Sequence, residues 1–352
     1  MLAGCAGRFD GFAPLPAAVQ RPHPQAVPHP ARGGGLLDRL DPARSVLPLA
    51  LAGALVDYRA GVRHGFRDAY DAGFNSVIAD PGQPQAAVRA AAEGSRLLVL
   101  SDDAAAAEGD PLLLDSRAAL LVPVAAPADL GRLAAAVRAA PERPVWALLR
   151  AHADPAGGIA MPDPQTARLL AFGALAAGAG GLVWQGEDNY VARNAGLLGI
   201  AAAPSLDYGI RTDPASGRQP YRATPADVAA SRRLWDAVAQ LNRQIARLAP
   251  MLLRPDDPQA YTAGIPAAAA GAAPALRLLL KPWDGDADPR RLLLAVNPGD
   301  DAVDIRIGFG RAVSRVERWQ DDDPEPPETD PARGLLRDRL PPRGVRLYRI
   351  TY

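Results

Sequence analysis

The sequence predicts an α/β protein that ends in an all-β region, and three observations lead to this prediction. The 352 residues exceed the usual size of one compact core, so two domains are expected. From about residue 45, short apolar runs alternate with alanine-rich helical stretches, which is typical of parallel strands joined by right-handed crossovers. After about residue 275, short strand-like runs are divided by Asp, Gly and Pro turns, which favours a small antiparallel β-sandwich.

Composition excludes several classes of function. The 39 basic and 39 acidic side chains give a formal net charge of zero, which argues against a nucleic-acid partner. No apolar run reaches the length of about 18 residues that a membrane-spanning helix needs. With one cysteine and no ligand-spaced pair between His64 and His152, we predict neither a metal site nor another cofactor.

The only cysteine, Cys5, ends the sequence Leu-Ala-Gly-Cys at residues 2–5, which resembles the lipobox of bacterial lipoproteins. A proline-rich stretch follows, so residues 1–44 are interpreted as a lipobox and an extended tether. The alternative is chance, because such residues are common in this chain. No basic and apolar leader precedes residue 2, so acylation implies codons upstream of Met1. We predict a lipid anchor at Cys5 as the only membrane contact, on an envelope protein that faces the periplasm or the exterior.

The α/β region is assigned to residues 45–255. Asp163 and Pro164 form a good helix start, and Gly73, Gly94 and Gly178 are expected to end helices. An open, doubly wound sheet fits the same pattern, but no Gly-x-Gly-x-x-Gly follows the first strand to support a dinucleotide site. The predicted strands are residues 46–56, 76–79, 96–100, 118–122, 145–149 and 181–184, and the predicted helices are residues 63–72, 85–93, 128–140 and 164–177.

A longer helix is predicted from Thr224 to about residue 248, with Pro250 ending it. Its apolar residues recur at three- and four-residue steps, as on a helix that packs against a core. These residues are Leu234, Val238, Leu241, Ile245 and Leu248. Residues 275–352 are assigned to the β-sandwich, with strands at 276–280, 292–297, 303–307, 313–319 and 345–350.

Three segments contain recognisable motifs. Residues 71–78 contain an "AGFN-x-V" strand entry, residues 165–184 contain a helix followed by a strand, and residues 292–348 contain Val-Asn-Pro and Leu-Pro-Pro. In this order the three segments resemble a family of glycoside-hydrolase-type (β/α) barrels, in which the second segment closes the barrel and the third belongs to an appended β-domain. The resemblance implies a TIM-like barrel with its site at the strand C-termini. About six strands are visible rather than eight, which points to a reduced or incomplete barrel.

The resemblance also implies a pair of carboxylates that act as acid and as nucleophile or base. Glu187 lies just past a predicted strand end, whereas Glu93, Glu108 and Glu142 lie in less suitable positions. Where related barrels carry Asp-Glu-Pro, this chain reads Ala-Ala-Pro at residues 125–127. The aspartates that follow strand-like runs are candidates for the second carboxylate, although such residues are commonly helix caps or turn residues. They are Asp57, Asp80 and Asp102, with Asp103 and Asp154 as further options.

Substrate contacts are expected from aromatic rings, which pack on the C–H face of a pyranose, and from polar groups near the same strand ends. The candidates are Trp184, Asp188, Asn189, Tyr190, Tyr58, Tyr208, Arg150 and His152. Arg150 and His152 are interpreted as ligands for a carboxylate or phosphate on a glycan, with a surface ion pair as the alternative for both.

The sequence therefore suggests a carbohydrate-active protein that resembles a glycoside hydrolase and acts on an envelope or extracellular glycan. The alternative is a barrel without catalysis that binds glycan or scaffolds a polysaccharide assembly. The missing Asp-Glu-Pro carboxylates favour this alternative.

Overall fold

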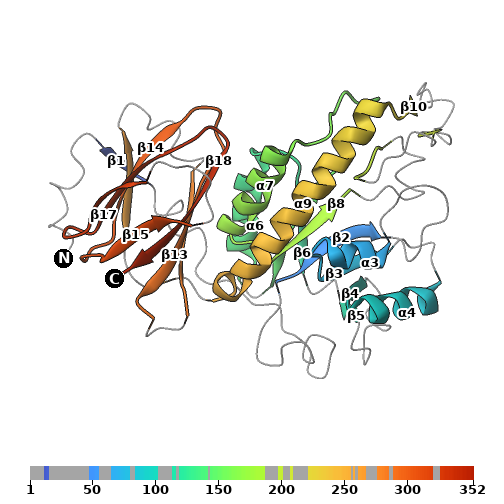
Figure 1. The fold of residues 1–352 in the computed structure, drawn as a ribbon, viewed down its shortest axis with the longest axis horizontal. Coiled ribbons are helices and arrows are strands. Elements are labelled where there is room, and N and C mark those ends of the chain that lie inside the picture. Colours follow the sequence, from blue (N-terminus) through green and yellow to red (C-terminus); the bar gives the residue numbers. More distant parts are fainter. Residues whose placement is uncertain are drawn as a thin grey trace.

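The computed structural model describes two regions, one built on a parallel sheet and one on antiparallel sheets (Figure 1). The described residues are 12–15, 47–54, 65–79, 84–101, 113–115, 119–141, 143–186, 197–200, 207–208, 221–254, 257, 261–266, 276–284, 288–319 and 326–352.

Seven strands form the parallel sheet, and all their described pairings are parallel, as predicted. Each of the six predicted runs overlaps one of them, and four of the observed strands end one or two residues later than predicted. The seventh, β5, is only three residues long and was not predicted. The strands are β2 (Leu49–Ala54), β3 (Ser76–Ala79), β4 (Leu98–Ser101), β5 (Leu113–Asp115), β6 (Leu120–Val124), β7 (Val145–Arg150) and β8 (Gly181–Gln185).

The order of the sheet is β5-β4-β3-β2-β8-β7-β6, so its two edge strands are consecutive in the chain. Only residues 116–119 separate β5 from β6, and the Cα atoms of Asp115 and Leu120 are therefore at most about 18 Å apart. In a flat sheet, six strand spacings would separate the edges by roughly 29 Å. The sheet must therefore curl. This is the strand order of a barrel opened between β5 and β6, which differs from a doubly wound sheet; the described residues include no β5–β6 pairing and so do not show closure.

Helices α3 (Phe66–Asp71), α4 (Gln85–Ser95), α6 (Asp129–Ala139) and α7 (Pro164–Ala176) connect these strands. Asp163 caps α7 by accepting a hydrogen bond from the Thr166 backbone N–H at 2.7 Å, with proline at the first helical position, as predicted. Gly73 (φ +81°) and Gly178 (φ +98°) occupy the expected left-handed positions.

The prediction that Gly94 ends its helix is wrong. Helix α4 continues to Ser95, and Arg96 takes the left-handed conformation with φ +58°. The reason is that Leu97 packs into the core, where it is fully buried. The chain turns at Arg96, and the Leu97 N–H donates to the Ala92 carbonyl at 2.9 Å, which caps the C-terminus of the helix.

Helix α9 (Pro225–Leu252) is the longest described helix, and it begins with a capping box of Thr224 and Asp227. All five residues of its predicted apolar stripe are buried. The prediction that Pro250 ends it is wrong, because the helix runs two residues further. A proline in the last turn removes a single helical N–H, and Met251 and Leu252 are buried against the core. Among the described helices, none is both long and apolar enough to cross a membrane.

The antiparallel region contains two sheets whose facing side chains share one hydrophobic cluster. Strands β1 and β11 lie outside residues 275–352, so this region also includes part of the predicted tether and a segment that was assigned to neither domain. A short ladder of β9 (Asp207–Tyr208) and β10 (Tyr221–Arg222) is separate. The larger sheet is β1 (Phe12–Pro14), β11 (Thr262–Pro266), β14 (Val303–Gly308), β17 (Leu335–Leu340) and β16 (Glu328–Asp330). The smaller is β12 (Arg277–Pro282), β13 (Arg290–Asn297), β18 (Gly344–Thr351) and β15 (Arg315–Arg318).

The smaller sheet also packs against the α/β region. Leu292, Leu294 and Leu347 belong to the same hydrophobic cluster as the buried residues of α7 and α9. In Figure 1, α6, α7 and α9 lie between the antiparallel strands and the parallel sheet. One layer of helices is therefore covered by sheet on two sides, which explains why α7 is buried along most of its length.

Candidate functional site

In (β/α) barrels, functional sites lie at the carboxyl edge of the parallel sheet, where the strands end. Arg150 is the last residue of β7 and is half-buried there. Its Nη1 donates to the carbonyls of Ala160, at 3.0 Å, and of His152, at 3.3 Å. Burial lowers the pKa of the Arg150 guanidinium from its ordinary value. The residue is thus held in a fixed position at the end of the strand.

His152 is fixed by the neighbouring strand. Its Nδ1 lies 2.8 Å from the Gln185 carbonyl oxygen at the end of β8. A carbonyl oxygen can only accept, so Nδ1 carries the hydrogen and Nε2 of the neutral ring is an acceptor. The same carbonyl also accepts the Ala151 N–H at 2.9 Å. The ends of β7 and β8 are therefore joined by two hydrogen bonds to one oxygen.

Gly186 allows the chain to leave β8 beside this pair. A Cβ atom at Gly186 would lie 2.4 Å from the Ala151 carbonyl oxygen, so no other residue fits without a shift of the backbone. The next residue in the chain is Glu187, the predicted catalytic carboxylate, which lies outside the described residues.

The described aspartates near this edge have structural roles. Each of four accepts a backbone N–H hydrogen bond, as expected for caps and turns. The bonds are Gly65 N to Asp68 (2.8 Å), Ala125 N to Asp129 (2.8 Å), Gly157 N to Asp154 (2.9 Å) and Thr166 N to Asp163 (2.7 Å). Asp154, a weaker candidate for catalysis, is therefore a turn residue. Ala125 and Ala126 directly follow β6, so neither of these two positions carries a carboxylate.

Trp184 is not a ligand contact, contrary to the prediction. Its side chain is fully buried, and its indole N–H donates to Asn242 Oδ1 of α9 at 3.2 Å. Strands in a parallel sheet are covered on both faces, so the aromatic residue before Gln185 enters the core. Asn242 also donates to the Ala72 carbonyl at 3.4 Å. A polar residue on the apolar face of a predicted helix was the sequence signal for this buried link.

The remaining predicted site residues lie outside the described part of the chain. They are Cys5, Asp57, Tyr58, Asp80, Asp102, Asp103, Glu187, Asp188, Asn189 and Tyr190. Tyr208 is described only as a backbone position in β9. Among the described residues, no group of three His, Cys, Asp or Glu side chains could hold a metal ion. Of the predicted substrate contacts, Arg150 and His152 lie together at the carboxyl edge, whereas Trp184 is buried in the core.

The motifs that carry the family resemblance stabilise the fold. Asn75 of the "AGFN" segment accepts from the Leu49 N–H at 2.8 Å and donates to the Leu47 carbonyl at 2.9 Å, which joins the starts of β2 and β3. Asn297 of the Val-Asn-Pro motif donates to the carbonyl of Pro341, in the Leu-Pro-Pro motif, at 2.9 Å. These motifs therefore indicate architecture and not chemistry.

The chain is similar in structure to solved glycoside hydrolases. One described as a glycoside hydrolase is 7% identical, with a TM-score of 0.48 over 88% of this chain and 94% of the other. AmyP in complex with maltose is 12% identical, with a TM-score of 0.40 over 78% and 64%. A family 30 subfamily 8 xylanase from Clostridium acetobutylicum is 9% identical, with a TM-score of 0.33 over 79% and 66%.

The chain thus spans about two thirds of the length of AmyP and of the xylanase. Similarity at this level assigns neither a substrate nor a reaction. No protein-family model matches the chain, and no curated protein sequence matches it.

Proposed function

We propose that the protein is carbohydrate-active and engages an envelope or extracellular glycan at the carboxyl edge of its parallel sheet. The observation that carries the proposal is the anchored pair of Arg150 and His152 at the end of β7, with His152 held by the Gln185 carbonyl at the end of β8. Both side chains are half-buried and oriented by backbone carbonyls before a ligand arrives. Such preorganisation reduces the entropy lost on binding.

The chemistry of the pair suits a sugar. The His152 Nε2 acceptor takes a hydrogen bond from a hydroxyl group, and the planar Arg150 guanidinium donates to hydroxyl or carboxylate oxygens. Glycans that carry a carboxylate or phosphate gain a charge-assisted bond to Arg150.

Hydrolysis is the finer proposal. In it, Glu187 supplies one carboxylate and Asp57, Asp80 or Asp102 supplies the other, one protonated and one ionised by its surroundings. The rival is a barrel that binds glycan without cleaving it. The alanines at residues 125–126 and the engagement of Asp129 by backbone N–H groups favour this rival, because the end of β6 then offers no free carboxylate.

A matched pair of arginine substitutions tests the site. Arg150 ends β7 and Arg143 lies two residues before its start, and both donate to backbone carbonyls. Arg150→Gln is expected to weaken glycan binding by about tenfold or more, since a charged donor is lost. Arg143→Gln is expected to leave the affinity unchanged. The measurement is calorimetric titration of the full chain with neutral and acidic oligosaccharides.

Two results oppose the proposal. Equal weakening by both substitutions would point to a general effect on the sheet, and the absence of saturable binding by the wild-type chain to any oligosaccharide would remove the site. His152→Ala serves as a second probe, because it removes the Nε2 acceptor and leaves Arg150 in place. Thermal melting of each variant separates lost affinity from lost fold.

Envelope localisation through Cys5 is part of the proposal. The support is the Leu-Ala-Gly-Cys sequence with a proline-rich stretch behind it. When the gene is expressed in a bacterium with its upstream codons, mass spectrometry of the membrane fraction is expected to find an acylated Cys5. A free, unmodified N-terminal peptide in that fraction would contradict the anchor.

A further inference from the structure

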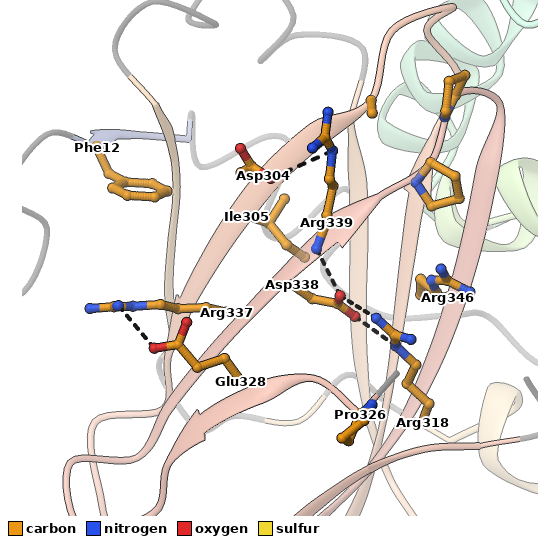
Figure 2. A pocket seen from close by; sticks show the side chains of 13 residues that line it. Phe12, Asp304, Ile305, Arg318, Pro326, Glu328, Arg337, Asp338, Arg339 and Arg346 are labelled. Atoms are coloured by element: carbon orange, nitrogen blue, oxygen red, sulfur yellow. Dashed lines mark hydrogen bonds and ion pairs between the residues drawn. The ribbon is translucent and has the colours of Figure 1, made fainter. Parts of the chain in front are cut away.

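A cavity of about 600 Å³ opens in the antiparallel region (Figure 2). Arg318 of β15 and Arg346 of β18 line it from the smaller sheet, and Asp304 of β14 and Asp338 of β17 line it from the larger. Its volume lies within the range of roughly 300–1,000 Å³ found for small-molecule sites.

The buried side of the cavity is a fixed network around Asp338. Arg318 and Asp338 form an ion pair in which the side chains are 9% and 4% exposed. The carboxylate of Asp338 accepts from Arg318 Nε at 3.0 Å, from the Tyr348 hydroxyl at 2.6 Å and from the Arg339 backbone N–H at 2.7 Å. Burial, and then the charge of Asp338, raise the pKa of the Tyr348 hydroxyl. Asp338 is thus engaged by the protein and forms part of the wall.

The rim carries two arginines in weak ion pairs. Arg337 Nη1 lies 3.0 Å from Glu328 Oε1, with the two side chains 46% and 70% exposed. Arg339 Nε lies 3.9 Å from Asp304 Oδ1, beyond hydrogen-bonding distance, with exposures of 73% and 59%. Exposed pairs of this kind add little to stability. Both guanidinium groups can therefore turn to a ligand at small cost.

The charges and surfaces of the cavity specify the ligand. Four arginines and three carboxylates line its described wall, a formal excess of one positive charge. Guanidinium groups match the two oxygens of a carboxylate. Asp304 and Glu328 accept hydrogen bonds from hydroxyl groups. The Phe12 ring and Pro341 offer apolar contact to C–H groups. A ligand that has a carboxylate, several hydroxyls and a C–H face fits all of these features.

We propose that this cavity binds a hexuronate unit of an acidic glycan, with the sugar carboxylate held by Arg337 and Arg339. The site goes beyond the function proposed above and does not depend on it, because it shares no residue with the edge that contains Arg150 and His152.

Trigalacturonate binding to the full chain, measured by calorimetry, tests the proposal. The double variant Arg337→Gln/Arg339→Gln is expected to bind about tenfold more weakly or worse, because two charge-assisted contacts are lost. The methyl ester of the same trimer, which has no charge, is expected to bind the wild-type chain as weakly. Arg333→Gln is the matched control, because this exposed arginine pairs with Asp330 and does not line the cavity. The variant is expected to bind trigalacturonate with the affinity of the wild-type chain.

A second variant keeps the test decisive if the double variant is unstable. Glu328→Gln retains an acceptor and removes the carboxylate that competes for Arg337, so trigalacturonate is expected to bind more tightly. The double substitution is expected to weaken trigalacturonate binding further when it is added to Arg150→Gln, which separates the two sites. Unaltered binding in the double variant, equal binding of the ester, or equal affinity for inorganic sulfate or phosphate would each overturn the proposal.

Discussion

Glu187→Gln is expected to lower glycan hydrolysis by the full chain by about 100-fold or more, because a general acid or base contributes 10²–10⁴ to the rate. Glutamine has nearly the same shape but cannot transfer a proton or attack a sugar carbon. Glycan binding and the melting temperature are expected to remain close to those of the wild type. The measurement is release of reducing ends from a broad panel of oligosaccharides, with calorimetry for binding.

Glu93→Gln is the control for this substitution, since Glu93 lies near the end of α4, just before β4 begins and thus on the opposite side of the sheet from the carboxyl ends of the strands. Unchanged turnover in Glu187→Gln would remove Glu187 from the mechanism. Binding without turnover in the wild-type chain would favour the non-catalytic rival. A crystal structure adds a geometric criterion. Retaining enzymes place the two carboxylates about 5 Å apart and inverting enzymes roughly 6.5–9.5 Å, so a separation beyond about 10 Å would contradict hydrolysis.

Asp338→Ala is expected to destabilise the protein by about 3–5 kcal/mol, the usual effect of removing one partner from a buried ion pair. The substitution leaves the Arg318 guanidinium and the Tyr348 hydroxyl without the carboxylate that accepts from both. Urea unfolding followed by circular dichroism measures the change in the free energy of unfolding.

Two further variants serve as controls for Asp338→Ala. Asp300→Ala removes a carboxylate from an exposed pair with Arg343 and is expected to change the free energy of unfolding by less than about 0.5 kcal/mol. The double variant Asp338→Leu/Arg318→Met replaces both charges with apolar groups and is expected to recover most of the loss. A loss below about 1 kcal/mol in Asp338→Ala would show that water or another side chain satisfies Arg318.

Local patterns predicted most elements of the fold, because they depend on residues close in sequence. The apolar stripe of α9 and the Asp163 cap are set within one or two turns of helix. Predictions failed where distant contacts decide the local structure. Arg96 takes the place expected for Gly94 because of the buried Leu97, and Phe12–Pro14 forms a strand because residues 264–266 pair with it.

The candidate site was predictable in part for the same reason. Arg150 and His152 follow a strand, and their place at the carboxyl edge follows from that alone. The orientation of His152 depends on the Gln185 carbonyl, 33 residues away, and thus on the register between β7 and β8. That of Arg150 depends on the carbonyls of His152 and Ala160. The cavity between β14, β15, β17 and β18 depends on two sheets meeting, which no single segment of sequence encodes.

The pairing of early strands with late ones has a consequence for synthesis on the ribosome. β2 can pair with β3 soon after both strands leave the ribosome. The other edge of β2 stays unpaired until β8 (Gly181–Gln185) has been made. β1 waits for Thr262–Pro266, some 250 residues later, which is roughly 10–50 s at bacterial translation rates. Unpaired edges are sites of aggregation during such delays. The nascent chain is therefore expected to need chaperone protection until its last third has been made.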